Sequence, residues 1–132
     1  PISNYLTQIN TQTQVYNPSL PDFLNTLKNT THAQGYYINL KEEVSIPIRG
    51  TSIDISNVSF ELKKGWNLIS LPSQTPLNVE TALASVSSYI IQVNNQTKVY
   101  NPNLPDFLNT LRELKPGEGY WINVSENCKL TF

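Results

Sequence analysis

Short stretches of alternating apolar and polar residues run through this chain, and turn-forming residues separate them. Residues 58–62 (Val-Ser-Phe-Glu-Leu) alternate strictly, and residues 35–40, 66–71 and 119–124 are rich in β-branched and aromatic side chains. Alternation with a period of two is typical of a strand with one buried face, and these side chain types favour strands. The pattern therefore predicts a mainly β protein.

The pattern of residues 5–48 returns at residues 89–132 without a gap, and about half of the positions are identical. The offset is 84 positions, as from Tyr16 to Tyr100. Self-similarity at a fixed spacing indicates a duplicated architecture. We therefore expect an internal duplication with pseudo-twofold symmetry, built as a small barrel or sandwich with short connecting helices.

Each copy is expected to contain a hairpin, a short helix, a strand that opens on Gly and a final strand. The expected strands are 5–10, 15–16, 35–40 and 44–48 in the first copy, and 89–94, 99–100, 119–124 and 128–132 in the second. Each helix of two to three turns should begin at Pro21 or Pro105, because Pro fits the first helical position. Phe23, Leu24 and Leu27, like their counterparts in the second copy, would form its apolar stripe.

The segment between the copies carries its own pattern. It predicts strands at residues 53–55, 58–62 and 66–72. A helix is predicted over residues 79–86, with Asn78 as its N-cap.

The two copies are not equally complete. Subtracting 84 from Gly65 and Pro72 places their counterparts before residue 1, so the first copy lacks its Gly-Trp-Asn strand and most of its first helix. We divide the chain into a first, N-terminally truncated repeat (residues 1–48), a connecting strand segment (49–60) and a second, complete repeat (61–132). Either a longer parent carries another Gly-Trp-Asn-like strand before residue 1, or one compact domain uses the central segment for both lobes.

The composition excludes some classes of partner and favours one cellular location. Charged residues make up 14% of the 132 positions, the net charge is -1 and the pI is near 5.8, which gives no electrostatic footprint for nucleic acid. No apolar run approaches the roughly 20 residues that span a bilayer, so no membrane insertion is expected. The chain begins with Pro and has no Met, which indicates a piece of a longer polypeptide. Low charge and abundant amides and hydroxyls favour an extracellular or cell-surface location as part of that larger protein.

Residues that could carry catalysis are few. His32 aligns with Pro116, and Cys128 aligns with Val44, so a nucleophilic site on either would exist in one copy only. The sequence contains no Cys/His cluster and no calcium-binding loop pattern. We therefore expect no enzyme activity, no metal and no cofactor.

One pair of carboxylates is duplicated. Asp22 and Asp106 could face each other across a pseudo-twofold axis, as paired catalytic carboxylates do. Their position directly after a helix-starting Pro has a structural reason, since an acidic side chain stabilises a helix N-terminus. We favour the structural interpretation.

Aromatic residues on the predicted strands are the candidate ligand-binding residues. Tyr36 with Tyr37, and Tyr120 with Trp121, are adjacent pairs of which strand alternation exposes one member. The buried member would fill the core, since aromatic rings carry large apolar area. The exposed member, beside Asn and Gln, is what a carbohydrate-binding surface needs, because ring faces stack on sugar C–H groups and amides bind hydroxyls.

Several motifs occur together in the second copy. Residues 65–72 read Gly-Trp-Asn-Leu-Ile-Ser-Leu-Pro, and residues 114–122 read Leu-Lys-Pro-Gly-Glu-Gly-Tyr-Trp-Ile. In order, they resemble a repeat of large bacterial and archaeal surface or secreted proteins. The resemblance covers residues 60–132 fully and 5–48 partly, since the first copy departs from it at His32-Ala33 and Tyr37.

This resemblance implies a noncatalytic, β-rich accessory module beside adhesion, S-layer or polysaccharide-processing domains. Its partners would be other domains of the same polypeptide, together with a polysaccharide or a cell-surface protein. We therefore expect a structural or interaction module, a spacer or adhesion repeat. The alternative is a carbohydrate-binding module that uses exposed strand aromatics.

Overall fold

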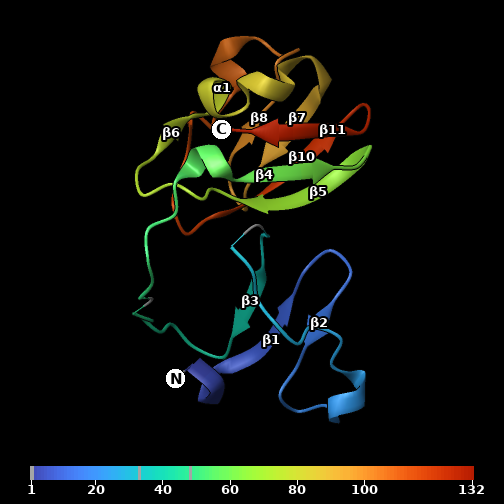
Figure 1. Cartoon of the computed structure of the whole chain (residues 1–132), viewed down its shortest axis with the longest axis vertical. Coiled ribbons are helices and arrows are strands. Elements are labelled where there is room, and N and C mark those ends of the chain that lie inside the picture. Colours follow the sequence, from blue (N-terminus) through green and yellow to red (C-terminus); the bar gives the residue numbers. More distant parts are fainter. Residues whose placement is uncertain (1, 33, 48) are drawn as a thin grey trace.

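A computed structural model describes residues 2–32, 34–47 and 49–132 of the chain. Strands make up 33% of it and helices 17%, so the prediction of a mainly β protein with short helices is confirmed. Figure 1 shows two parts joined by an extended segment. We call the described residues between 2 and 40 the small lobe, and residues 55–132 the large lobe.

The elements are short throughout. The small lobe contains η1 (Ile2–Asn4), β1 (Leu6–Asn10), β2 (Val15–Tyr16), η2 (Asp22–Leu24) and β3 (Tyr37–Leu40). The large lobe contains η3 (Ile55–Asn57), β4 (Ser59–Leu62), β5 (Gly65–Ser70), β6 (Leu77–Asn78), α1 (Val79–Ala82), η4 (Ala84–Tyr89), β7 (Ile90–Asn94), β8 (Val99–Tyr100), η5 (Asp106–Leu108), β9 (Glu113–Leu114), β10 (Gly119–Val124) and β11 (Cys128–Thr131).

The large lobe holds the main hydrophobic core. Its four-stranded antiparallel sheet has the order β5-β10-β7-β8, and β4 pairs with β11 in a second, two-stranded sheet. Inward-facing residues of both sheets pack with the apolar side of α1 and η4. Tyr120, Ile122 and Val124 of β10 are completely buried there, as the alternation along this strand predicts.

The small lobe repeats part of that sheet, with the order β2-β1-β3. Ile9 pairs with Tyr16 and Ile38 in this lobe, and the residues 84 positions later pair in the same way, Val93 with Tyr100 and Ile122. The register irregularity near the start of β1 also returns in β7. The two copies of the sequence pattern therefore form equivalent strand pairs.

The predicted helices of two to three turns are wrong. Each copy forms a single 3-10 turn, η2 or η5, after which the chain becomes extended at Asn25 or Asn109. In the second copy, the Asn109 Oδ1 accepts a hydrogen bond of 2.7 Å from the Asn101 backbone N–H. This contact ties the chain back to β8 and ends the helix. Phe23 is 82% exposed, so the predicted apolar stripe does not form.

The segment between the copies agrees with the prediction in part. The Asn78 side chain caps α1 by accepting from the Glu80 and Thr81 backbone N–H groups, as expected, and η4 continues the turn in place of a single helix. The predicted strand 53–55 is wrong, because Asp54 accepts from the Ser56 N–H and starts η3 instead. Of the predicted strand 44–48, residues 44–47 are not strand, and residue 48 lies outside the described residues.

The lobes meet along β5. The Gly35 backbone N–H donates to the Leu68 carbonyl at 3.4 Å, and the Gln12 Nε2 donates to the Trp66 carbonyl at 2.6 Å. The sheets do not close into a barrel. Pseudo-twofold symmetry and the division into two repeats stay predictions. Over the described residues, no helix has the length and apolar character needed to cross a membrane.

Candidate functional site: an aromatic surface where the lobes meet

Two of the candidate ligand residues meet across the lobe junction. The Trp121 Nε1 donates a hydrogen bond to the Tyr37 hydroxyl at 3.1 Å. Their ring centroids are 6.1 Å apart and the rings are tilted by 35°. Tyr37 is 37% exposed and Trp121 is partly exposed, so both reach the surface. They occupy equivalent positions in the two copies.

The other two candidates have structural roles. Tyr120 is completely buried, and its hydroxyl accepts from the Lys115 backbone N–H at 2.7 Å and donates to the Glu118 Oε2 at 2.8 Å. Burial strongly raises the pKa of Tyr120. The hydrogen bond from the Lys115 N–H lowers this pKa, whereas the hydrogen bond to Glu118 and the charge of Glu118 raise it further. The hydroxyl of Tyr36 accepts from the Thr31 N–H at 2.7 Å. Both hydroxyls therefore hold the turn that precedes their own strand.

A third aromatic residue belongs to this surface, although the sequence did not single it out as a ligand residue. Trp66 on β5 is 41% exposed. It lines a hollow of about 480 Å³ together with Trp121, Gln12, Gln92 and Asn94. The relevant signal is strand register, which the sequence alone does not provide.

The register explains how these side chains come to one face. In the four-stranded sheet, Trp121 lies opposite Leu68 on one side and Asn94 on the other. In the next row on the same face, Asn123 lies opposite Trp66 and Gln92. Residues directly opposite in a sheet share a face. On the outer face of the sheet, the two tryptophans therefore lie beside several amide side chains.

The amides are held in place by local hydrogen bonds. The Gln92 Nε2 donates to the Asn94 Oδ1 at 3.4 Å. The Gln12 side chain, from the β1–β2 turn of the small lobe, binds the Trp66 carbonyl and so closes one end of the hollow. Each amide carries both donors and acceptors, which is the capacity needed to bind hydroxyl groups.

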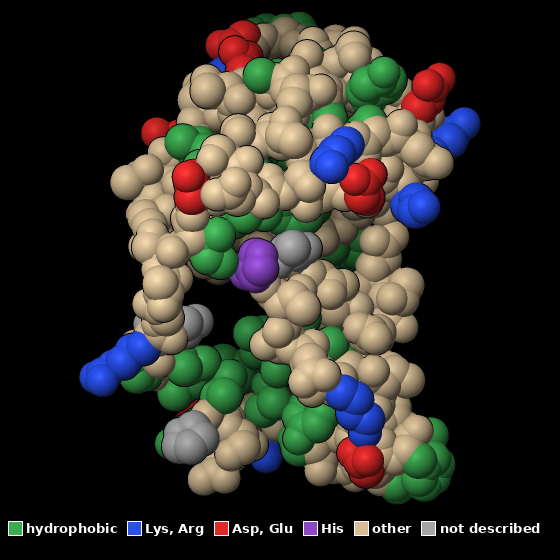
Figure 2. All heavy atoms as spheres, in the orientation of Figure 1, with side chains coloured by type: hydrophobic (Ala, Val, Ile, Leu, Met, Phe, Trp, Pro, Cys, Tyr) green, Lys and Arg blue, Asp and Glu red, His purple; other side chains and the backbone are tan. Residues whose placement is uncertain are grey.

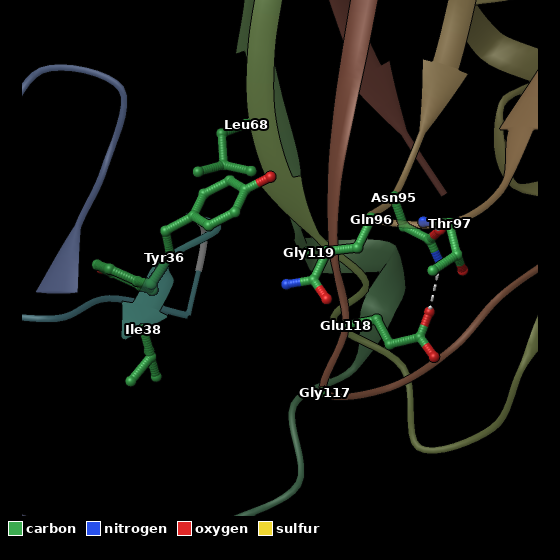
Figure 3. A pocket seen from close by; sticks show the side chains of 10 residues that line it. Tyr36, Ile38, Leu68, Asn95, Gln96, Thr97, Gly117, Glu118 and Gly119 are labelled. Atoms are coloured by element: carbon green, nitrogen blue, oxygen red, sulfur yellow. Dashed lines mark hydrogen bonds between the residues drawn. The ribbon is translucent and has the colours of Figure 1, made fainter. Parts of the chain in front are cut away.

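A second hollow is lined in part by Tyr37. It has a volume of about 390 Å³ and is lined by Tyr36, Tyr37, Ile38 and Leu68 on one side and by residues 95–97 and 117–119 on the other. Figure 3 shows Tyr36 and Ile38 on one side of this hollow, with the Tyr36 ring directed toward Leu68, and the turns that carry Gln96 and Glu118 on the other side. The dashed line is the hydrogen bond of 3.1 Å from the Asn95 Nδ2 to the Glu118 Oε2. Tyr37 lines this second hollow, and Trp121 lines the first. Because the two residues contact each other, the Tyr37–Trp121 pair connects the two hollows.

The charge of this region is low. Of the described residues that line the two hollows, Glu118 alone is charged, and its carboxylate is already bound by Asn95 and Tyr120. Among the described residues, no group of three His, Cys, Asp or Glu side chains is arranged to hold a metal ion. The surface is therefore suited to an uncharged ligand with hydroxyl groups.

The duplicated carboxylates lie elsewhere and pair with cations in their own turns. The Lys28 Nζ lies 2.6 Å from the Asp22 Oδ1, and the Arg112 guanidinium binds Asp106 in the same way. The Arg112 hydrogen bond lowers the pKa of Asp106. A lowered pKa makes Asp106 a poor general acid. The structural reason differs from the predicted one, because the helix of two to three turns does not form and each Asp instead pairs with a basic side chain.

The two remaining candidates are also separate from the aromatic surface. His32 is exposed, and its backbone carbonyl accepts from the Ser70 hydroxyl at 3.3 Å. Cys128 lies on β11 at the edge of the core, and burial raises the pKa of its thiol. A raised pKa disfavours the reactive thiolate.

Comparison with models of known protein families gave no match, and neither the curated proteins nor the solved structures that were searched gave one. The resemblance to a surface-protein repeat therefore remains a prediction from the motifs.

Proposed function

We propose that this chain is a noncatalytic interaction module of a larger surface or secreted protein, and that it binds a neutral polysaccharide at the Trp66–Trp121–Tyr37 surface. The observation that carries the proposal is the grouping of three surface aromatic residues from both lobes with the amides of Gln12, Gln92 and Asn94.

The chemistry of the grouping supports a sugar ligand. The C–H face of a sugar ring is apolar and packs on an aromatic ring, while its hydroxyl groups need donors and acceptors at the edge of that ring. Trp66 and Trp121 offer the rings, and the flanking amides offer both kinds of hydrogen-bonding group. An acidic polysaccharide is less suitable, since the lining residues include no Lys or Arg.

The same arrangement supports a binding role over catalysis. The surface is open and lacks a base beside a nucleophile among its lining residues. Adhesion through a cell-wall or extracellular polysaccharide would place the protein at the cell surface or outside the cell, beside other domains of its polypeptide. A spacer without a ligand is the competing function, and the binding experiment separates the two.

The test is a pull-down of the intact chain with insoluble neutral polysaccharides, namely cellulose, chitin, xylan and mannan. We expect at least one to retain the protein, and the Trp66→Ala variant to lose at least tenfold in affinity. Phe23→Ala is the matched control, because Phe23 is more exposed than Trp66 and lies outside the surface. Circular dichroism of both variants checks the fold.

Two results would overturn the proposal. One is the absence of binding to every polysaccharide of the panel, which would favour the spacer. The other is equal binding by the Trp66→Ala and Phe23→Ala variants, which would place the binding surface elsewhere.

A further inference from the structure

The small lobe has an uncovered apolar face. Ile38 on β3 is 50% exposed, whereas its counterpart Ile122 on β10 is completely buried. Ile9 is partly exposed, and its counterpart Val93 is completely buried. Figure 2 shows apolar side chains gathered on the small lobe, on the side that faces the gap between the two lobes. The same sheet face is therefore core in one copy and surface in the other.

The large lobe shows what covers this face in the second copy. Strand β5 pairs along the whole of β10, from Gly119 to Val124. The segment that follows β5 forms α1 and η4, and Val79, Leu83 and Val86 from it join the core with Ile122. Residues 58–89 therefore supply both the edge strand and the helical cover.

Among the described residues, the equivalent edge in the small lobe has no partner strand. Strand β3 ends the three-stranded sheet, paired with β1 on one side. Strand β5 of the same chain contacts the backbone two residues before this edge, through the 3.4 Å hydrogen bond from the Gly35 N–H to the Leu68 carbonyl. Within the described part of the chain, residues 37–40 thus present an unpaired strand edge beside an apolar face, a combination that accepts another strand.

We infer that the small lobe is a receptor for a strand-and-helix segment of the same sequence type as residues 58–89, donated by a neighbouring module of the same kind. The internal copy identifies the donor, because it shows which sequence fits this sheet. The inference does not depend on polysaccharide binding.

The second copy also defines the pairing. Gly65 lies opposite Val124 and Leu68 lies opposite Trp121. By the offset of 84, the donor residues equivalent to Gly65 and Leu68 would lie opposite Leu40 and Tyr37. The donor would thereby bury Ile38, at roughly 25 cal/mol for each Å² of apolar surface removed from water.

A second segment supports the same inference. Strand β11 pairs with β4, with Cys128 opposite Leu62. The counterpart of β11 is residues 44–47, which form no strand in the structure. Its pairing partner would be the donor's equivalent of β4. We therefore expect residues 44–47 to become a strand when the donor binds.

The test uses a synthetic peptide of residues 57–89, labelled with a fluorophore, and the intact 132-residue chain. We expect saturable 1:1 binding by fluorescence anisotropy, with slower hydrogen exchange at residues 37–40 and 44–47. A scrambled peptide of the same composition should not bind. The Ile38→Asp variant should bind at least tenfold more weakly, while Phe23→Asp, an equally polar change at an exposed site, should bind normally.

Three outcomes would overturn the inference. The first is the absence of peptide binding. The second is binding that Ile38→Asp does not weaken, or binding that increases hydrogen exchange in β5. In both cases the peptide would replace the chain's own segment in the large lobe. The third is a dimer of the intact chain that Ile38→Asp dissociates and the peptide does not, which would make a second copy the occupant.

Discussion

The Trp121 indole N–H donates to the Tyr37 hydroxyl at 3.1 Å, and these two residues hold the same position in the two copies of the sequence pattern. One belongs to the four-stranded sheet of the large lobe and the other to the three-stranded sheet of the small lobe. Their contact therefore joins the lobes and, at the same point, forms the centre of the aromatic surface.

Removing the Tyr37 hydroxyl should loosen this junction without unfolding either lobe. We expect Tyr37→Phe to destabilise the chain by about 1 kcal/mol at most, since the hydrogen bond is partly exposed to water. A double-mutant cycle of Tyr37→Phe with Trp121→Phe, measured by urea unfolding, isolates the pair. Strictly additive effects of the two substitutions would show that the hydrogen bond does not stabilise the protein.

The backbones of the two lobes pack closely at Gly35. A Cβ at Gly35 would lie 2.6 Å from the Ile69 carbonyl oxygen, whereas at the equivalent Gly119 the nearest atom would be 3.8 Å away. We expect Gly35→Ala to destabilise the lobe contact by about 1–3 kcal/mol, the usual range for overpacking.

Gly119→Ala and Gly50→Ala are the controls for that substitution, since a Cβ at Gly50 would meet nothing within 4 Å. Thermal unfolding and small-angle scattering of all three variants measure stability and lobe separation. A Gly35→Ala variant as stable and as compact as Gly119→Ala would contradict the close contact.

The Asn109 side chain ends the single turn η5. Its Oδ1 accepts from the Asn101 N–H at 2.7 Å, and its Nδ2 donates to the Asn101 carbonyl at 3.2 Å. Because Asn109 is buried, Asn109→Ala should leave the Asn101 N–H unpaired and cost about 1–3 kcal/mol in urea unfolding, while the Asn101 carbonyl still accepts from the Leu104 N–H. The exposed Asn103 offers a control, and equal effects of Asn109→Ala and Asn103→Ala would refute this role.

The buried Tyr120 hydroxyl makes stability depend on alkaline pH. Burial, its largest cause, raises the pKa of Tyr120 in the folded chain above the value of about 10 for an exposed tyrosine. The folded state therefore favours the neutral phenol. The stability that the neutral phenol adds to the fold is fully present below about pH 10 and is lost as the pH rises toward the folded pKa. Urea unfolding between pH 8 and pH 11 should show this loss.

Tyr120→Phe should flatten the pH dependence above pH 10, because the variant has no phenol there to ionise. Tyr5→Phe, at a partly exposed tyrosine, should keep the wild-type dependence. If Tyr120→Phe loses stability as steeply as the wild type above pH 10, another group is responsible.

The sequence predicted most strands correctly, but the two helices expected at Pro21 and Pro105 are wrong, and the reason is local. Strand β10 alternates Tyr120, Ile122 and Val124 inward, and β-branched and aromatic residues leave few alternatives for such a stretch. The Pro-Asp-Phe-Leu stretch looks like a helix start, but the Asn101–Asn109 contact, eight residues apart, overrides that preference. A contact of this kind is not visible in local periodicity.

The candidate site was predictable in part. Alternation correctly predicted that one of Tyr120 and Trp121 is buried, and the structure shows that it is Tyr120. It did not bring Trp66 or Gln12 to the same surface, because that requires the pairing of β5 with β10 and the docking of the small lobe on β5.

Tryptophan fluorescence tests the proposed polysaccharide surface most directly, because the chain has two tryptophans and both line the hollow. A titration with soluble oligosaccharides of the polysaccharide that the pull-down selects should give a saturable change in emission. The change should shrink strongly in Trp66→Ala and persist in Phe23→Ala. An emission spectrum that stays constant while the protein binds the same polysaccharide would contradict binding at Trp66 and Trp121.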